Sequence, residues 1–270
     1  MLRLKFAVGG SIAEFHPPAL LNKLASVFES AGIPLAMGKE KRPRPIVRLA
    51  YPLPLGVEGL EEWADITLES GLSDPPDVIM ARLKPYCPDG LEILGVDQIP
   101  LHASSIAELC ETAHWRWFCP EALLSDAVLK LGVFTDSDSF QISKTGKLYG
   151  KKGVKSIEVR HFIRELCWDG NVLCFSTKIV QGQALSPQKL FVGILGVDPG
   201  RLGKFQRVRI DFRLDPRLDR VDKFAQKLRN LYEDAVLLES GPNLKVHDDD
   251  DDFFERLNFD FSTRSDRLKQ

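Results

Sequence analysis

The chain lacks any close pairing of cysteines in its 270 residues. Five cysteines are dispersed along the sequence, and no two of them form a Cys-x-x-Cys pair. They are Cys87, Cys110, Cys119, Cys167 and Cys174. A dispersed, odd-numbered set predicts reduced thiols rather than a disulfide framework or a zinc site, and most of them are expected to fill the core.

Other signals are also missing. No apolar run approaches the roughly 20 residues that a membrane helix needs, and the N-terminus has no signal-peptide pattern. There is no phosphate-binding glycine loop and no Gly-x-Gly-x-x-Gly, and the histidines show no metal-ligand spacing. We therefore expect a cytoplasmic protein that binds no membrane, metal or cofactor.

The composition describes an ordinary globular protein, with 44% hydrophobic and 27% charged residues. Its net charge of −2 gives no overall attraction to nucleic acid, so any such binding depends on local patches.

Residues 1–105 predict one half of an α+β fold. Apolar side chains alternate with period two at Leu2, Leu4, Phe6 and Val8, as in a half-buried strand. A helix from Pro17 to the residues before Gly32 follows, and a second helix opens at Pro75-Pro76. Further strands are predicted over residues 45–51, 63–68 and 91–99. This β-α-β-β-α-β order is that of a ferredoxin-like half.

Residues 112–215 predict a second ferredoxin-like half from the order of elements alone. The expected strands are residues 115–118, 156–164, 172–179 and 205–214, and the expected helices are 120–130 and 187–195. Asp169-Gly170 is a turn signal between the two middle strands. The last strand alternates apolar residues with charged neighbours. Trp115 and Trp117 share one strand face, which favours a core position over base stacking.

The C-terminal part predicts a helix over residues 216–240 and an acidic, disordered tail over 241–270. The tail contains five consecutive aspartates, Asp248 to Asp252, and four phenylalanines. A solubilising tail and a segment that docks on a basic surface both remain open.

Two segments concentrate positive charge. The first is stiffened by Pro43 and Pro45 and carries Lys39, Lys41, Arg42, Arg44 and Arg48. The second is a glycine-punctuated, hairpin-like stretch that carries Lys144, Lys147, Lys151, Lys152 and Lys155. Such patches are typical of surfaces that face nucleic acid, although a solvated charged loop would have the same composition.

Several short motifs occur in a fixed order along the chain. They are Gly9-Gly10, Gly32, Pro43-Arg44-Pro45, Pro52-Leu53-Pro54-Leu55-Gly56-Val57-Glu58, the basic run 151–155, and Ser186-Pro187-Gln188-Lys189-Leu190. This series resembles the radical-SAM-linked family, a bacterial family of unknown function found fused to or encoded beside radical-SAM proteins. The resemblance is best over residues 1–101 and implies a radical-SAM protein as partner. The dispersed cysteines exclude a radical-SAM cluster in this chain.

His16 is the candidate catalytic residue. Histidine suits general acid–base work, and some ferredoxin-like endoribonucleases use one near this position. The resemblance implies a His-x-Asp element at the start of the first helix, but ungapped alignment places Pro17 and Ala19 there. This departure favours a diverged, non-catalytic member and a structural or solvent-exposed His16.

The sequence therefore predicts a non-catalytic RNA-associated accessory module. The residues expected to contact phosphates are Lys39, Lys41, Arg42, Arg44, Arg48, Lys147, Lys151, Lys152 and Lys155. Two alternatives stay open: a metal-independent endoribonuclease that uses His16, and a protein–protein scaffold that docks through its acidic tail.

Overall fold

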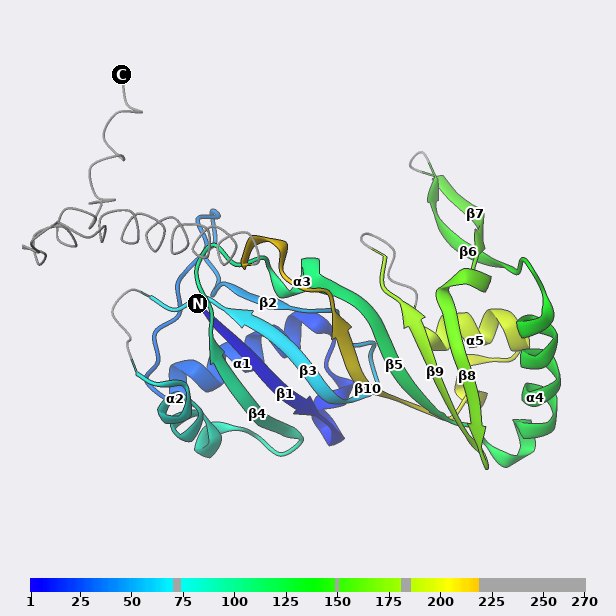
Figure 1. The fold of residues 1–270 in the computed structure, drawn as a ribbon, viewed down its shortest axis with the longest axis horizontal. Helices are drawn as coiled ribbons and strands as arrows, with labels where there is room; N and C mark the ends of the chain where they lie inside the picture. The colour runs from blue at the N-terminus through cyan, green and yellow to red at the C-terminus, as the bar shows by residue number, and fades with distance from the viewer. Residues whose placement is uncertain (70–73, 149–150, 181–185, 219–270) are drawn as a thin grey trace, which may run out of the picture. The chain divides into compact units, whose positions relative to one another are not determined.

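A mixed, eight-stranded β-sheet runs through the described part of the chain (Figure 1). The structure is a computed structural model that describes residues 1–69, 74–148, 151–180 and 186–218, with the backbone alone for residues 144–148 and 151–155. The described residues belong to one compact unit, Met1–Leu218. The acidic tail and all but the first three residues of the predicted C-terminal helix lie outside the described residues.

The first half, residues 1–101, holds one set of elements. They are β1 (Leu2–Val8), η1 (Gly10–Glu14), α1 (Pro17–Ser30), β2 (Val47–Leu49), β3 (Glu58–Ile66), α2 (Pro76–Leu83), η2 (Lys84–Tyr86) and β4 (Leu91–Gln98). β1 lies between β4 and β3, and β2 pairs with β3 on its other edge. All three pairings are antiparallel.

The second half, residues 110–212, follows the short helix α3 (Ile106–Leu109). Its elements are β5 (Cys110–Phe118), α4 (Glu121–Asp136), β6 (Gln141–Leu148), β7 (Lys151–Glu158), η3 (Arg160–Phe162), β8 (Ile163–Asp169), β9 (Val172–Lys178), α5 (Pro187–Leu195), η4 (Pro199–Arg201) and β10 (Lys204–Phe212). The strand order β10-β5-β9-β8 is antiparallel throughout, and β6 and β7 form a separate hairpin.

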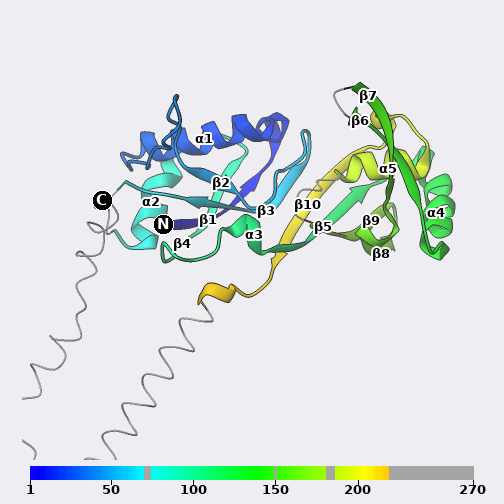
Figure 2. The same cartoon turned by 90° about the horizontal axis from the view of Figure 1, so that it is seen from above.

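One short parallel pairing joins the two halves into a single sheet. Gln206 and Arg207 of β10 pair with Glu58 and Gly59 at the start of β3. β2 uses the other end of the same edge, opposite residues 64–66. α1 and α5 consequently lie on the same side of one continuous sheet (Figure 2).

Local sequence signals explain where the helices begin and end. His16 caps α1, and Pro17 and Pro18 occupy the first positions, where a missing N–H costs no helical hydrogen bond. Ser186 caps α5 through the amide of Lys189, and Gly196 ends that helix with a φ of 68°. Both helices therefore have well-defined N-termini.

Alternation along the strands builds the main core beneath the helices. Leu2, Leu4, Phe6 and Val8 are all buried, as the period-two pattern predicts. Trp115 and Trp117 are also buried, which confirms the expectation of a core position. Trp117 packs against Trp168, Phe191 and Phe205.

The predicted strand over residues 156–164 is wrong in its bounds and its pairing. β7 ends at Glu158, and the strand that pairs with β9 is β8. The chain turns between them because the Glu158 carboxylate accepts the backbone N–H groups of Phe140 and Arg160, which fixes a 3₁₀ turn. β3 also begins earlier than predicted, at Glu58.

Candidate functional site

The first basic segment forms an irregular hairpin over residues 36–48. The amide of Gly38 donates to the carbonyl of Arg44 at 2.8 Å, and that of Ile46 donates to Ala36 at 2.9 Å. Met37 and Pro45 form an isolated bridge between its arms. The arms are tied to β3 because Ala36 donates to the carbonyl of Thr67. We call this segment the basic hairpin.

The basic hairpin presents its cations to solvent. Lys39, Lys41, Arg42, Arg44 and Arg48 are all exposed. Within the described residues, no carboxylate oxygen lies within 4 Å of any of these five side chains. An exposed cation without a carboxylate partner does not have to break an existing ion pair when it binds an external anion.

The second basic segment is the β6–β7 hairpin. The register places Lys144 opposite Lys155 and Lys147 opposite Lys152, with Lys151 opposite Leu148. The side chains of these residues lie outside the described ones. Both views place this hairpin and the basic hairpin apart, one in each half (Figures 1 and 2). The two predicted phosphate-contacting segments are therefore separate surfaces.

His16 has a structural role at the start of α1. Its Nδ1 accepts the backbone N–H of Ala19 at 3.1 Å, and the side chain is exposed. Because Pro17 and Pro18 carry no N–H, this bond satisfies the first free donor of the helix. Among the predicted phosphate-contacting cations whose side chains the structure describes, none hydrogen-bonds to His16.

A groove of about 690 Å³ lies between the two halves and was missed by the sequence reasoning. One wall is the loop from Tyr51 to Leu55, and the other is the start of α5 from Ser186 to Lys189. Gln188 Nε2 donates across the groove to the carbonyl of Leu55 at 3.4 Å. The signal was available, because both walls belong to the ordered motifs noted in the sequence.

Arg207, a fully buried arginine of β10, holds one wall of the groove from within the protein. Its Nε donates to Glu62 Oε1 at 2.7 Å, and Nη2 donates both to the other Glu62 oxygen and to the carbonyl of Tyr51. Nη1 donates to the carbonyl of Pro52 at 3.3 Å. The guanidinium also lies 5.4 Å from the ring centroids of Tyr51 and Trp115. Arg207 thus fixes one wall of the groove to the sheet.

Burial of the Arg207–Glu62 pair changes the chemistry of the carboxyl group. Removal from water raises the pKa of Glu62, and the charge and hydrogen bonds of Arg207 oppose that rise. The alternation of apolar and charged residues in this strand predicts that Arg207 lies on its charged face, away from the core. The register shift between Arg207 and Arg209 instead keeps Phe205 and Arg207 on the core side.

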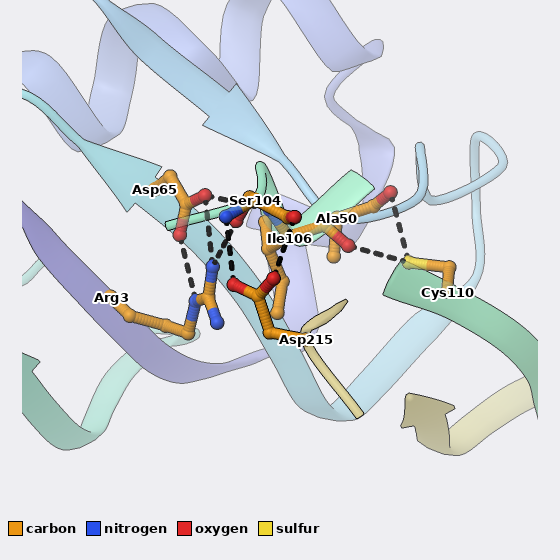
Figure 3. Close-up of polar contacts among 7 residues, drawn as sticks. All are labelled: Arg3, Ala50, Asp65, Ser104, Ile106, Cys110 and Asp215. Carbon is orange, nitrogen blue, oxygen red and sulfur yellow. Dashed lines mark hydrogen bonds and ion pairs between the residues drawn. The ribbon is translucent and has the colours of Figure 1, made fainter. Parts of the chain in front are cut away.

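A second buried polar cluster lies on the opposite side of the first half (Figure 3). Arg3 pairs with both Asp65 oxygens, at 2.9 and 3.2 Å, and donates to the carbonyl of Ser104. Asp65 also accepts the N–H of Ile106 at 2.7 Å, and Asp215 accepts from the Ser104 amide and hydroxyl. These groups satisfy one another, so the cluster holds residues 104–106 in place rather than forming an open binding site.

The chain matches one family model, described as an uncharacterized protein conserved in bacteria (DUF2344), over residues 2–187. The chain belongs to this family. The DUF2344 match spans the basic hairpin, the β6–β7 hairpin and the Tyr51–Leu55 wall, and it ends at Pro187, before β10. No curated protein matches the chain.

Burial disfavours the thiolate form of two cysteines in the described part of the chain. Burial raises the pKa of Cys110 to about 12 and that of Cys119 to about 11, so both are neutral thiols near neutral pH. Among the described residues, no group of three or more His, Cys, Asp or Glu side chains is arranged to hold a metal ion. Within the same residues, no helix has the length and apolarity needed to cross a membrane.

Proposed function

We propose that the protein is a non-catalytic RNA-binding accessory module whose basic hairpin contacts phosphates. The observation that carries this proposal is the display of five exposed cations on one hairpin, without a carboxylate of the described residues within 4 Å. Arginine forks onto phosphate oxygens and lysine acts as a point charge, so the set suits a polyanionic backbone.

We also propose that the chain holds two ferredoxin-like halves in tandem. Each half has two helices on one side of four antiparallel strands in the order fourth, first, third, second, which supports two ferredoxin-like halves in tandem. Such folds serve many functions, so the fold alone does not select RNA. The β6–β7 hairpin, with its lysines, is the second proposed phosphate-contacting segment.

The non-catalytic part of the proposal rests on the groups that would have to react. His16 Nδ1 is engaged in capping α1, and the buried carboxylates Glu62 and Asp65 are saturated by hydrogen bonds from Arg207, Arg3 and Ile106. The resemblance to the radical-SAM-linked family supports a radical-SAM protein as partner.

The test is a fluorescence-anisotropy titration of single-stranded RNA at two salt concentrations. We compare the native protein with R42E/R44E/R48E and with a control of equal net charge, K84E/K189E/R201E, which reverses three exposed cations outside both hairpins. Each lost phosphate contact should reduce the log–log salt slope by about 0.7. The hairpin variant should therefore lose about 2 from the slope while the control does not.

Two outcomes contradict the proposal. If the native protein does not bind RNA, the function is wrong. If the hairpin variant and the control bind equally, the basic hairpin is not the site. RNA cleavage in EDTA that disappears in His16→Ala would instead support the endoribonuclease alternative.

A further inference from the structure

The second half of the sheet has one face with no helix over it in the described part of the chain. α4 and α5 cover the face that carries Trp115 and Trp117, and their apolar side chains share one core with it. Every second residue of β5 and β9 lies on the opposite face of the sheet. We call this opposite side the open face.

The strand registers fix the rows of residues that cross the open face. One row reads Lys204, Phe118, Val172 and Asp169, the next Gln206, Arg116, Cys174 and Cys167, and the third Arg209, His114, Ser176 and Arg164. Asp211, Thr112 and Lys178 form the last row. Arg213 follows β10 at the same end as Lys178, and both line one hollow.

Cations outnumber acidic residues in the rows of the open face. Six cations lie on it or at its end, namely Arg116, Arg164, Lys178, Lys204, Arg209 and Arg213, and all six are exposed. Of the acidic residues there, Asp211 contacts His114 at 2.6 Å and Arg209 at 3.1 Å. Among the described residues, the other five cations have no carboxylate oxygen within 4 Å.

The open face is hollowed at two places along its length. Arg164, Lys178 and Arg213 come from three different segments and line a hollow of about 400 Å³ together with Glu108 and Glu111. Arg116, His114 and Arg209 line another of about 250 Å³ together with Glu165. Register shifts in β8 and β10 adjoin these hollows, and bulges of this kind redirect side chains on a sheet.

An exposed aromatic ring lies at the end of the open face farthest from Lys178. Phe118 is 39% exposed and is paired in register with Lys204 and Val172. A ring that is open to solvent beside cations supplies a stacking partner for a base whose phosphate is neutralised nearby. Stacking of this kind requires an unpaired base, because the bases of a duplex are already stacked on each other.

We propose that the open face is a second RNA-binding surface, specific for single-stranded RNA. Phe118 stacks on a base, and Arg116, Lys178 and Lys204 contact successive phosphates along β5 and its neighbours. The inference rests on the proposed RNA-binding function for the class of ligand, but it uses none of the residues of the basic hairpin. Neither segment of positive charge noted in the sequence includes these cations.

The experiment adds two variants to the titration described above. R116E/K178E/K204E reverses three exposed cations of the open face and has the same net charge as K84E/K189E/R201E. Phe118→Ala removes the ring alone. The probes are a 12-nucleotide oligouridine and a 12-base-pair RNA duplex, each at low and moderate salt.

We expect R116E/K178E/K204E to bind the single strand at least tenfold more weakly than the control. We expect Phe118→Ala to weaken single-strand binding about fivefold or more and to leave duplex binding unchanged. A variant that fails to fold would lose both probes, so unequal loss separates stacking from misfolding. Cross-linking of 5-iodouridine oligonucleotide to the native protein should modify a peptide that contains Phe118.

The outcomes separate this inference from the proposed function. Loss in the hairpin variant, with the open-face variants equal to the control, overturns the open face alone. Loss in the open-face variants only supports the open face and removes the basic hairpin. Absence of RNA binding by the native protein overturns both.

Discussion

The two halves have a similar order of strands and helices, but they differ on the second face of the sheet, the one that lies opposite the helices. In the first half, two pairs of charged groups on this face contact each other, Arg3 with Asp65 and Lys5 with Glu61, while Arg48, opposite Asp65 in the register, stays exposed as part of the basic hairpin. Residues 104–106 bond to the Arg3–Asp65 pair, and Ile106 packs into the small apolar cluster against Trp63. In the second half, the corresponding face keeps its cations exposed.

This difference separates stability from binding on one scaffold. A paired, buried charge contributes to folding and has no capacity left for a ligand, whereas an exposed, unpaired cation contributes little to folding and is available for an anion. We therefore expect substitutions in the Arg3–Asp65 pair to change stability, and substitutions of the exposed cations of the open face to change binding.

The largest expected effect comes from the ion pair that joins the halves. Glu62→Leu leaves Arg207 buried without its carboxylate, and the free energy of unfolding should fall by about 3–5 kcal/mol. Urea denaturation followed by tryptophan fluorescence measures this change. Both halves should unfold in one transition, because Glu62 belongs to β3 and Arg207 to β10.

The control is the double variant Glu62→Leu/Arg207→Met, which removes both charges. It should recover most of the lost stability, since well-packed apolar side chains can replace a buried ion pair. A loss below about 1 kcal/mol in the single variant would contradict the burial and pairing of Arg207.

A matched pair of aspartates tests the comparison directly. Asp65 is 3% exposed and accepts from Arg3 and Ile106, whereas the Asp211 side chain is 45% exposed and contacts His114 and Arg209. Asp65→Asn should cost about 2–3 kcal/mol because charged hydrogen bonds are lost in a buried place. Asp211→Asn should change stability by less than about 1 kcal/mol. Equal costs, measured by urea denaturation, would show that the two faces do not differ.

The sequence predicts elements well where local signals are strong. The cap and proline at the start of α5 give its bounds correctly, and the turn at Gly170, with a φ of 59°, lies between β8 and β9 as predicted. The bounds of β7 and β8 were wrong because the turn between them depends on Glu158 reaching the amide of Phe140, 18 residues earlier. No local pattern encodes such a contact.

The candidate surfaces were only partly accessible from sequence. The basic hairpin is contiguous, so its five cations are visible in the sequence. The groove and the open face are each assembled from segments more than 50 residues apart, such as Leu55 with Gln188 and Phe118 with Lys204. The burial of Arg207 was not predicted, because a one-residue register shift in β10 moves its side chain to the face opposite the one that simple alternation assigns.

The smallest expected effect concerns the β6–β7 hairpin, which has no counterpart in the first half. Glu158 anchors the base of this hairpin, and hydrogen bonds from Ser139, Phe140 and Arg160 lower its pKa from 4.5 to about 2. Because the folded pKa lies below the ordinary value, this contribution to stability is complete above about pH 4.5 and is lost as the pH falls towards 2.

Glu158→Gln should therefore lower the melting temperature at pH 7, and its difference from the native protein should shrink between pH 4.5 and pH 2.5. Thermal unfolding followed by circular dichroism across this range measures both quantities. Glu92→Gln, an exposed glutamate of β4, provides the control and should show no such convergence. A constant difference between native protein and Glu158→Gln at every pH would mean that the carboxylate charge does not anchor the hairpin, and that the second half holds it by packing alone.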